Sequence, residues 1–330
     1  MNTLKIFLLR TWWLSGVIFL CACAHAQNYP TRPIKFIVPW PPGGGADILA
    51  RMITPKLAEV LGQAVVIDNR GGAAGNIGAE LASKSLPDGY SILFAYSGTH
   101  SINPHMMSKM PFSAKDFSSV IFLTLVPEIL VVNPSLPVKN VKELIALAKT
   151  AVNPMTFGSA GNGSINHLTG VLFEMMSGVQ LLHIPYRGGG PALNSILAGE
   201  TQLFFGVPAI LEQQIKAGKL KALGVTSAHR TLAFPDLPTI TESGVPGYDV
   251  TSWNGVMVPS GTPLSIITKL NDAFNKTLSS PELRQKLIDS GFEPIGGEPE
   301  KFAKFVNSEL NKWAPVVKKA GLQPGNNDEP

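Results

Sequence analysis

Two glycine-rich loops contain the residues best suited to bind an anion. The first runs from Pro41 to Asp47 and places Gly43, Gly44 and Gly45 directly before an apolar-periodic segment that is predicted to be a helix. The first N–H groups of a helix lack intrahelical acceptors and lie at its positive end, so such a loop can hold an anion without lysine or arginine. A tight turn in which glycine only relieves backbone strain is an equally open interpretation. Asp47 is interpreted as a cap or first-turn acid, with direct ligand contact as the alternative.

A second loop repeats the arrangement about 120 residues later in the chain. It runs from Ser159 to Ser164, contains Gly161, and again separates a short apolar run from a predicted helix. Ser164 is a candidate N-cap whose hydroxyl or amide would face a carboxylate. Thr99 and His100 follow another predicted strand, where polar groups would reach the same kind of sheet edge. Three such loops without a cationic side chain predict a site for a small anion.

The motifs of other site chemistries are absent from the sequence. The first loop lacks the spacing G-x-G-x-x-G, and no Gly-Lys-Ser/Thr follows a glycine run, so neither phosphate-binding motif is met. There is no G-x-S-x-G and no His-Glu-x-x-His. His100 and His105 are poorly spaced for a metal, and His167 and His183 have no acid or thiol nearby in sequence. We therefore predict no catalytic residue, no metal and no cofactor, although a Ser–His–Asp site assembled in space stays open.

The elements that must position these loops alternate between short apolar runs and amphipathic segments. Strands are predicted at 34–40, 65–67, 90–96, 128–132, 155–159, 181–184, 202–206, 222–226 and 256–259, with helices between and after them. This alternation predicts parallel sheets covered on both faces, with ligands beyond the carboxyl ends of the strands. We expect an α/β protein of two doubly wound lobes. Residues 27–126 plus 251–330 would form one lobe and 127–250 the other, with crossovers near 125–127 and 251–254.

Length and composition agree with a folded protein of two lobes. The chain has 330 residues, of which 45% are hydrophobic and 15% charged, which is ample for two cores. The net charge is only +4 and no basic run or aromatic-interleaved basic stripe occurs, so we predict no nucleic-acid partner. No feature indicates an oligomer, and a monomer is expected.

The N-terminus is typical of an export signal. Lys5 and Arg10 form a positive region, Trp12 to Ala24 is apolar, and Ala24-His25-Ala26 has the small-x-small pattern of a cleavage site. The apolar stretch is shorter than the roughly 20 residues of a membrane span. We predict a signal peptide over 1–26 and a periplasmic mature protein without cysteine. The alternative is a lipobox ending at Cys23, which would anchor the protein through a lipidated cysteine.

The chain resembles the Bug-type periplasmic substrate-binding proteins of tripartite tricarboxylate transporters over essentially its whole mature length. The matching motifs are, in order, Arg32-Pro33-Ile34-Lys35, Pro42-Gly43-Gly44 with Asp47 and Arg51, Asp68-Asn69-Arg70 with Gly75, Ile77 and Gly78, Thr99-His100 with Asn103-Pro104, Gly158-Ser159-Ala160-Gly161 with Ser164 and His167, Pro185-Tyr186-Arg187-Gly188, Gly218-Lys219-Leu220, and Pro259-Ser260-Gly261-Thr262-Pro263.

This resemblance implies a periplasmic-binding-protein (Venus flytrap) fold that closes on a carboxylate and delivers it to membrane permease subunits. The implied ligand-binding residues are Trp40, Gly43, Gly44, Gly45, Asp47, Thr99 and His100 in one lobe, and Ser159, Gly161, Ser164, His167 and Tyr186 in the other. Ligand contact with both lobes would stabilise the closed state.

Departures from the family pattern bear on the ligand. Many relatives have an acid just after the strand at 202–205, where this chain has Gly206-Val207. An acid there could pair with a substrate ammonium, so we predict a carboxylate without an amine. Trp40 stands where smaller or phenyl side chains are common, and Asn254 stands where an aromatic often follows Trp253. A di- or tricarboxylate or an aromatic acid packed against Trp40 is expected. A ligand-sensing partner of a membrane receptor and a secreted enzyme acting on a carboxylate are the competing functions.

Overall fold

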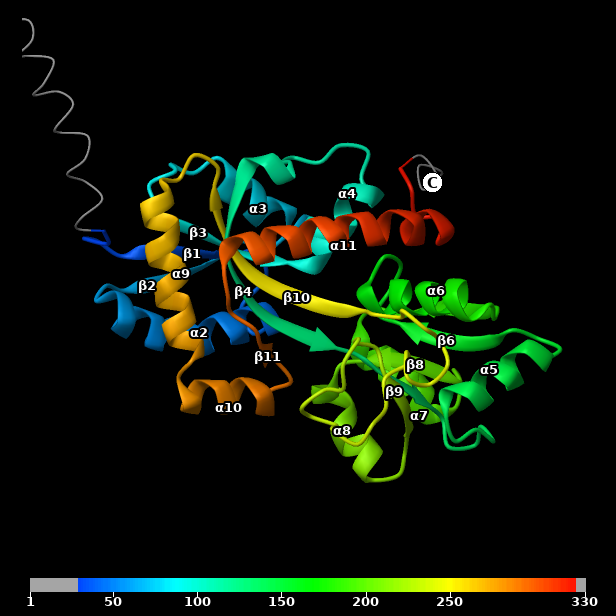
Figure 1. Cartoon of the computed structure of the whole chain (residues 1–330). Coiled ribbons are helices and arrows are strands. Elements are labelled where there is room, and N and C mark those ends of the chain that lie inside the picture. Colours follow the sequence, from blue (N-terminus) through cyan, green and yellow to red (C-terminus); the bar gives the residue numbers. More distant parts are fainter. Residues whose placement is uncertain (1–28, 325–330) are drawn as a thin grey trace, which may run out of the picture.

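The chain folds into two lobes, each built on its own β-sheet (Figure 1). The computed structural model describes residues 29–324. The predicted signal peptide (1–26) and the lipobox cysteine, Cys23, lie outside these residues.

The first lobe contains a six-stranded sheet in the order β11-β4-β10-β3-β1-β2. Its strands are β1 (Ile34–Val38), β2 (Val65–Asn69), β3 (Ser91–Tyr96), β4 (Phe117–Pro127), β10 (Thr251–Pro259) and β11 (Glu293–Pro294). The apolar sides of α2 (Gly45–Leu61), α9 (Leu264–Leu278) and α10 (Pro281–Asp289) cover one face of this sheet. The other face is covered by α3 (Asn76–Ser83) and by α11 (Pro299–Lys319). Side chains alternate between these faces along β1, so Phe36 and Ile37 enter different clusters.

The second lobe contains a five-stranded sheet in the order β7-β6-β8-β5-β9. Its strands are β5 (Ile129–Val132), β6 (Met155–Ser159), β7 (Leu181–Pro185), β8 (Leu203–Gly206) and β9 (Lys221–Val225). Helices α5 (Val141–Thr150) and α6 (Ile165–Ser177) pack on one face, and α7 (Gly189–Ala198) and α8 (Pro208–Lys216) pack on the other. The prediction of an α/β protein with two doubly wound lobes is confirmed.

The prediction of parallel sheets holds for β1 with β2 and β3 and for β6 with β7 and β8, but not for the rest of either sheet. β10 runs antiparallel to both β3 and β4, and β5 runs antiparallel to β8 and β9. The strand β4 was not predicted at all, although it spans 11 residues. Its centre is buried from Val120 to Thr124, so it lacks the alternation of apolar and polar residues that marks a half-buried strand.

The two predicted crossovers are neighbouring segments of one antiparallel ladder. Thr251 at the start of β10 pairs with Pro127 at the end of β4. Thr226 stabilises this junction, because its hydroxyl accepts from Glu128 N at 2.8 Å and donates to Val250 O at 2.7 Å. The hydroxyl therefore ties the end of β9 (Lys221–Val225) to both crossover segments.

Helix α11 is shared between the lobes. Its first half packs on the sheet of the first lobe, where Gly255 allows a close approach, because a Cβ there would overlap the ring of Phe302. Its last turns contribute Trp313, Val316 and Val317 to the core of the second lobe. Figure 1 shows α11 running from beside β10 toward α6. The last turns of α11 thus pack against 127–250, although residues 251–330 were predicted to lie wholly in the first lobe.

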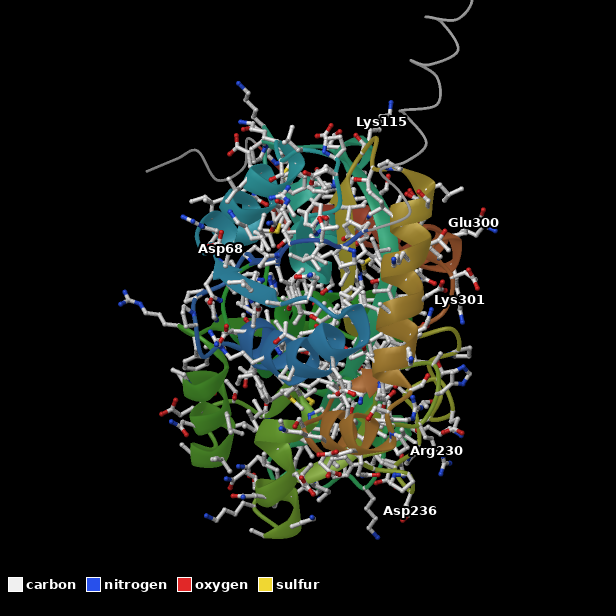
Figure 2. All side chains as sticks on the ribbon, turned by 90° about the vertical axis from the view of Figure 1, so that its left-hand side faces the viewer. Asp68, Lys115, Arg230, Asp236, Glu300 and Lys301 are labelled. Carbon is white, nitrogen blue, oxygen red and sulfur yellow. The ribbon has the colours of Figure 1, made fainter. Side chains whose placement is uncertain are left out.

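Charged side chains lie mainly on the outside of the molecule. Figure 2 shows Lys115, Arg230 and Glu300 projecting from the periphery. No helix of residues 29–324 is both long and apolar enough to cross a membrane. The same described residues contain no group of three or more His, Cys, Asp or Glu side chains placed to hold a metal ion.

Candidate functional site: a cavity between the lobes

The first glycine-rich loop is held in shape by one carboxylate. Asp47 accepts hydrogen bonds from Gly43 N at 2.9 Å, from Arg51 Nε at 2.8 Å and from Asn69 Nδ2 at 3.0 Å. Gly43 has φ of +82°, a left-handed conformation that glycine adopts without strain. These contacts agree with the predicted role of Asp47 as a first-turn acid. Its side chain is 2% exposed and stabilises the loop through hydrogen bonds. The side-chain hydrogen bond from Arg51 is the main reason that the pKa of Asp47 falls to about 2.

Asn69 is a site residue that the sequence analysis named only as part of a motif. Its Nδ2 also donates to Trp40 O at 3.0 Å, so this amide at the end of β2 connects the start of the loop to the first turn of α2. The parallel pairing of Val38 with Asn69 places both strand ends at the same edge of the sheet. The signal was available in the sequence, because Asn69 comes two residues after the predicted strand at 65–67.

The start of α2 is open to a ligand. Its N-cap residue is Gly44, and no side chain caps the helix. The carboxylate of Asp47 takes the N–H of Gly43, which precedes the helix, and leaves the N–H groups of the first turn for another acceptor. The positive end of the helix dipole acts in the same place. An anion at this position would therefore be stabilised by backbone groups alone.

These N–H groups face a cavity of about 770 Å³ between the lobes. That volume lies in the range typical of small-molecule sites. The lining residues are Trp40, Pro41, Gly44, Gly45, Ala46, Ile48, Tyr96, Val126, Val207, Ala209, Ile210, Ser252, Asn254, Ser290, Gly291 and Phe292. None of these side chains carries a charge.

The cavity has an apolar body and a few polar groups. The rings of Trp40 and Tyr96 meet edge to face with centroids 5.6 Å apart. Ser252 and Asn254 contribute from β10, and both are almost fully buried. The wall from the second lobe is apolar, with Val207 and Ile210 at the start of α8. Shape and polarity therefore suit an organic acid whose carboxylate lies near α2 and whose body contacts aromatic and aliphatic side chains.

Thr99 and His100 do not line this cavity. Thr99 is fully buried, and its hydroxyl donates to Ala74 O at 3.0 Å, which stabilises the turn η1 (Ala73–Gly75). His100 lies in the next turn, η2 (Gly98–Ile102), and borders a different cavity beside α11. The strand β3 does end at the cleft, but the side chain that reaches the cavity is Tyr96.

The second glycine-rich loop hydrogen-bonds mainly to itself. Ser164 is the N-cap of α6, as predicted, and its hydroxyl donates to Gly161 O at 2.6 Å and accepts from His167 N at 3.3 Å. Gly163 N donates to His167 Nδ1 at 3.2 Å. Tyr186, also predicted as a site residue, places its hydroxyl 3.5 Å from a carboxylate oxygen of Glu200. None of these residues lines the cavity at Trp40.

The structure brings together a serine and a histidine that the sequence analysis did not connect. Ser159 Oγ lies 2.6 Å from His183 Nε2, because β6 and β7 are neighbouring parallel strands. The rings of His183 and His167 stack with centroids 3.7 Å apart. Burial lowers the pKa of both histidines to about 4, so both are neutral at pH 7.

This Ser–His pair lacks the geometry of a nucleophile. Ser159 is fully buried, and its hydroxyl also contacts both Gly161 N and Gly161 O at 3.1 and 3.2 Å. No carboxylate appears among the hydrogen-bond partners of His183 in the described residues, so nothing fixes the ring as an acidic partner does in a catalytic triad. The pair stabilises the second loop.

The similarity to known proteins agrees with this geometry. Residues 49–322 match the family described as the tripartite tricarboxylate transporter family receptor, TctC. The protein BugT of Bordetella pertussis is 36% identical over 307 residues, which cover 92% of this chain and 94% of that protein.

Two solved structures of similar proteins contain a carboxylate ligand. The structure described as R. palustris Rpa4515 with adipate is 38% identical, covers 89% of this chain and 99% of that one, and superimposes with a TM-score of 0.75. MatC from Rhodopseudomonas palustris with bound malate is 30% identical, covers 88% of this chain and 100% of that one, and gives a TM-score of 0.71. The periplasmic-binding-protein fold and the resemblance to Bug-type proteins are confirmed. The chain belongs to the tripartite tricarboxylate transporter receptor family, TctC.

Proposed function

We propose that this chain is a periplasmic receptor that captures an amine-free carboxylate between its lobes and delivers it to the permease of a tripartite tricarboxylate transporter. The observation that carries the proposal is a cavity without any charged side chain that faces the uncapped start of α2. Export through a signal peptide at 1–26 and a monomeric receptor are part of the proposal. The bound ligands of the two R. palustris proteins, adipate and malate, support a carboxylate.

The cavity favours acids without an amine. A ligand ammonium would need an anionic partner, because a buried unpaired charge is strongly destabilising. The lining offers none, since Val207 occupies the wall of the second lobe and the carboxylate of Asp47 is already engaged with Arg51. Trp40, Tyr96 and Phe292 supply the contact area for the carbon skeleton. Dicarboxylates and aromatic acids are the ligand classes that we propose.

Closure would follow from contact with both lobes. The acid would bind the start of α2 on the first lobe and the start of α8 on the second, across the junction at Thr226. The lobes that we propose comprise 27–126 with 251–312, and 127–250 with the last turns of α11. Ligand contact with both halves stabilises the closed state. The sequence predicts that the second glycine-rich loop also contacts the ligand, and Ser164→Ala tests this prediction.

The proposal is tested with chemically matched ligand pairs. The protein without residues 1–26 is screened by thermal shift and calorimetry against the pairs glutarate and glutamate, succinate and aspartate, and 3-phenylpropionate and phenylalanine, and also against adipate, malate and benzoate. A ligand at 100 times its dissociation constant adds about 2.7 kcal/mol to the free energy of unfolding, which such a screen detects. We expect binding of the amine-free acids and at least a tenfold preference over amino acids. Micromolar binding of an amino acid would contradict the ligand class, and a flat screen would contradict the receptor function.

Two variants sharpen the result. Trp40→Leu should weaken aromatic acids more than adipate, because it removes ring contact and keeps an apolar wall. Val207→Asp places an acid in the wall of the second lobe. It should weaken dicarboxylate binding about tenfold or more and strengthen binding of the amino acid of each pair.

A bound acid recovered chemically unchanged after long incubation distinguishes a receptor from an enzyme.

A further inference from the structure

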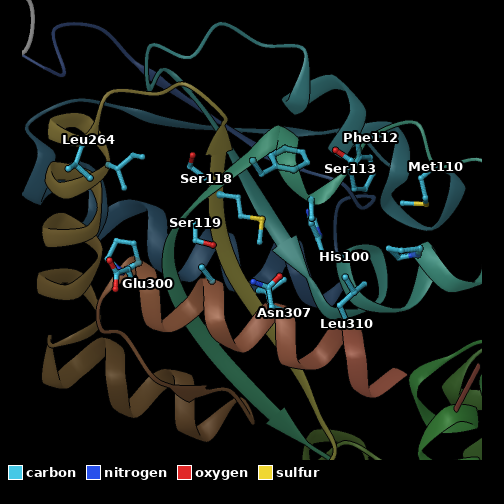
Figure 3. A pocket seen from close by; sticks show the side chains of 18 residues that line it. His100, Met110, Phe112, Ser113, Ser118, Ser119, Leu264, Glu300, Asn307 and Leu310 are labelled. Carbon is cyan, nitrogen blue, oxygen red and sulfur yellow. The ribbon is translucent and has the colours of Figure 1, made fainter. Parts of the chain in front are cut away.

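A second cavity, with a volume of about 650 Å³, lies beside α11 and shares no lining residue with the cavity at Trp40. Figure 3 shows it between α9, α11, the strands β4 and β10, and the segment that carries Met110, Phe112 and Ser113. The lining residues are His100, Pro104, Met110, Phe112, Ser113, Ala114, Phe117, Ser118, Ser119, Met257, Leu264, Ile267, Pro299, Glu300, Ala303, Val306, Asn307 and Leu310.

The inner wall of this cavity contains an unpartnered polar atom. His100 is 7% exposed, and its Nε2 is buried without a hydrogen-bond partner. Its Nδ1 lies 3.3 Å from Tyr96 O, an interaction in which the ring nitrogen must donate. In the neutral ring, Nε2 is then an acceptor. A buried acceptor without a partner costs free energy, so its retention requires an explanation.

The surroundings of His100 are aromatic and disfavour charge on the ring. Its centroid lies 5.6 Å from that of Phe112, 5.7 Å from that of Phe117 and 6.2 Å from that of Trp253. Burial lowers the pKa of His100 to about 4, so the ring is neutral at pH 7. The exposed carboxylate of Glu300 is the one charged group in the lining (Figure 3). An anion would find no cation here and would approach a negative side chain.

The local backbone is unusual. His100 lies in η2, a single turn of π-helix, and such turns occur frequently at functional sites. The turn places the imidazole four residues after Tyr96, whose ring borders the carboxylate cavity. The two cavities are therefore reached from one short segment, yet they differ in character, since a charged side chain, Glu300, lines the cavity beside α11 and none lines the cavity at α2.

We propose that the cavity beside α11 binds an uncharged small molecule with an apolar body and one hydroxyl or N–H group that donates to His100 Nε2. Phe112, Phe117 and Met257 contact the apolar body. Ser118, Ser119 and Asn307 are available to further polar groups of the ligand near the opening. The site is distinct from the carboxylate cavity and does not depend on the proposed receptor function.

The test uses phenol and toluene, which differ in one hydroxyl group. Binding to the protein without residues 1–26 is followed by the ¹⁵N signals of the histidine side chains and by a titration isotherm. We expect phenol to shift the His100 Nε2 signal and to bind about tenfold tighter than toluene, as expected for one additional hydrogen bond. His100→Phe keeps an aromatic ring and should remove the preference for phenol.

Ala303→Phe supplies the matched control, because it fills the cavity from α11 without touching the cavity at Trp40. It should abolish phenol binding and leave adipate or benzoate affinity unchanged. If this variant folds poorly, Asn307→Trp blocks the opening instead. Equal affinities for phenol and toluene would overturn the proposal and leave Nε2 to a water molecule. Phenol binding that persists in Ala303→Phe would also overturn the proposal. So would competition between carboxylates and phenol for the same site.

Discussion

The two glycine-rich loops each join a strand to a helix but use their hydrogen bonds differently. In the first loop the acid, Asp47, lies inside the helix and reaches back to Gly43, so the helix start itself has no side-chain cap. In the second loop Ser164 stands at the N-cap and its hydroxyl bonds both Gly161 O and His167 N. The first loop therefore presents free backbone donors to the cavity, and the second loop uses its polar groups internally.

This difference shows that glycine content alone does not identify an anion site. The informative feature is the residue at the N-cap, because it determines whether the first N–H groups of the helix already have an acceptor. Gly44 leaves them free, whereas Ser164 does not. The following variants test this contrast, starting with the largest expected effect.

Gly45→Pro removes one backbone N–H at the start of α2. Proline is tolerated at the first helical position, and Gly44 has φ −78° and ψ 166°, the extended conformation that a residue before proline adopts. We expect carboxylate affinity to fall roughly 10- to 100-fold, as for one hydrogen bond to a charged group. Calorimetry with the best acid from the screen measures the change.

Ile165→Pro is the matched control at the same position of α6, where Ser164 is also extended. It should leave the carboxylate affinity unchanged within about twofold, even if lost packing lowers stability. Equal losses of affinity in both variants would mean that the two helix starts bind the ligand alike. Wild-type affinity in Gly45→Pro would mean that α2 does not hold the carboxylate.

Asp47→Asn tests whether this side chain shapes the loop. The amide cannot accept from Gly43, Arg51 and Asn69 together, because half of it is a donor. We expect a loss of about 1–3 kcal/mol in the free energy of unfolding, measured with urea, together with weaker carboxylate binding. Arg51→Gln is the control, and should cost much less stability than Asp47→Asn because the arginine is 57% exposed. Full stability of Asp47→Asn would show that glycine alone sets the loop.

The two loops should also respond to acid in different pH ranges. The folded-state pKa of His167 and His183 is about 4, below the 6.5 of an unfolded chain, so the unfolded state binds more protons and stability falls as the pH drops from 6.5 toward 4. The contribution of Asp47 is lost only as the pH falls from 3.8 toward 2. At pH 5 the amide of Gly163 should therefore lose protection from hydrogen exchange while that of Gly43 keeps it.

The second loop loses stability between pH 7 and pH 5, and His183→Gln should reduce this loss. The reduction should be on the order of 1 kcal/mol, because the ring is half-buried. The same variant should leave Gly43 protection unchanged. Simultaneous loss of protection in both loops would indicate global unfolding and would remove the contrast in pH response.

Much of the fold could be predicted from the sequence because most strands are short apolar runs that end in glycine-rich turns. The strands at 34–38 and 155–159 and the helices that follow them agree with the prediction within a residue or two. The antiparallel strands β4 and β10 were missed or shortened, because a buried central strand shows no alternation. The sharing of α11 between lobes follows from contacts among residues far apart in the chain, which no local pattern encodes.

The candidate site was predictable only in part for a related reason. Trp40, Gly44 and Gly45 do line the cavity, since they lie at the end of a strand whose direction the sequence reveals. Val126, Ser252 and Asn254 reach it through the antiparallel ladder, and that pairing was not predicted. His100 faces another cavity because a π-helical turn, which has no clear sequence signal, sets its direction.

Ser164→Ala is the change with the smallest expected effect and the most direct test of the second loop. Losing an N-cap hydroxyl costs about 1 kcal/mol, and carboxylate affinity should stay within about twofold of the wild type because the hydroxyl is engaged with Gly161 and His167. Asn140 caps α5 far from the cavity, because its side chain accepts from Glu143 N. Asn140→Ala should therefore lower the free energy of unfolding by a similar amount. If Ser164→Ala loses carboxylate affinity tenfold while Asn140→Ala, with the same loss of stability, does not, then lobe closure turns the Ser164 hydroxyl to the ligand. The second loop would then be a binding loop in the closed state, as its sequence predicts.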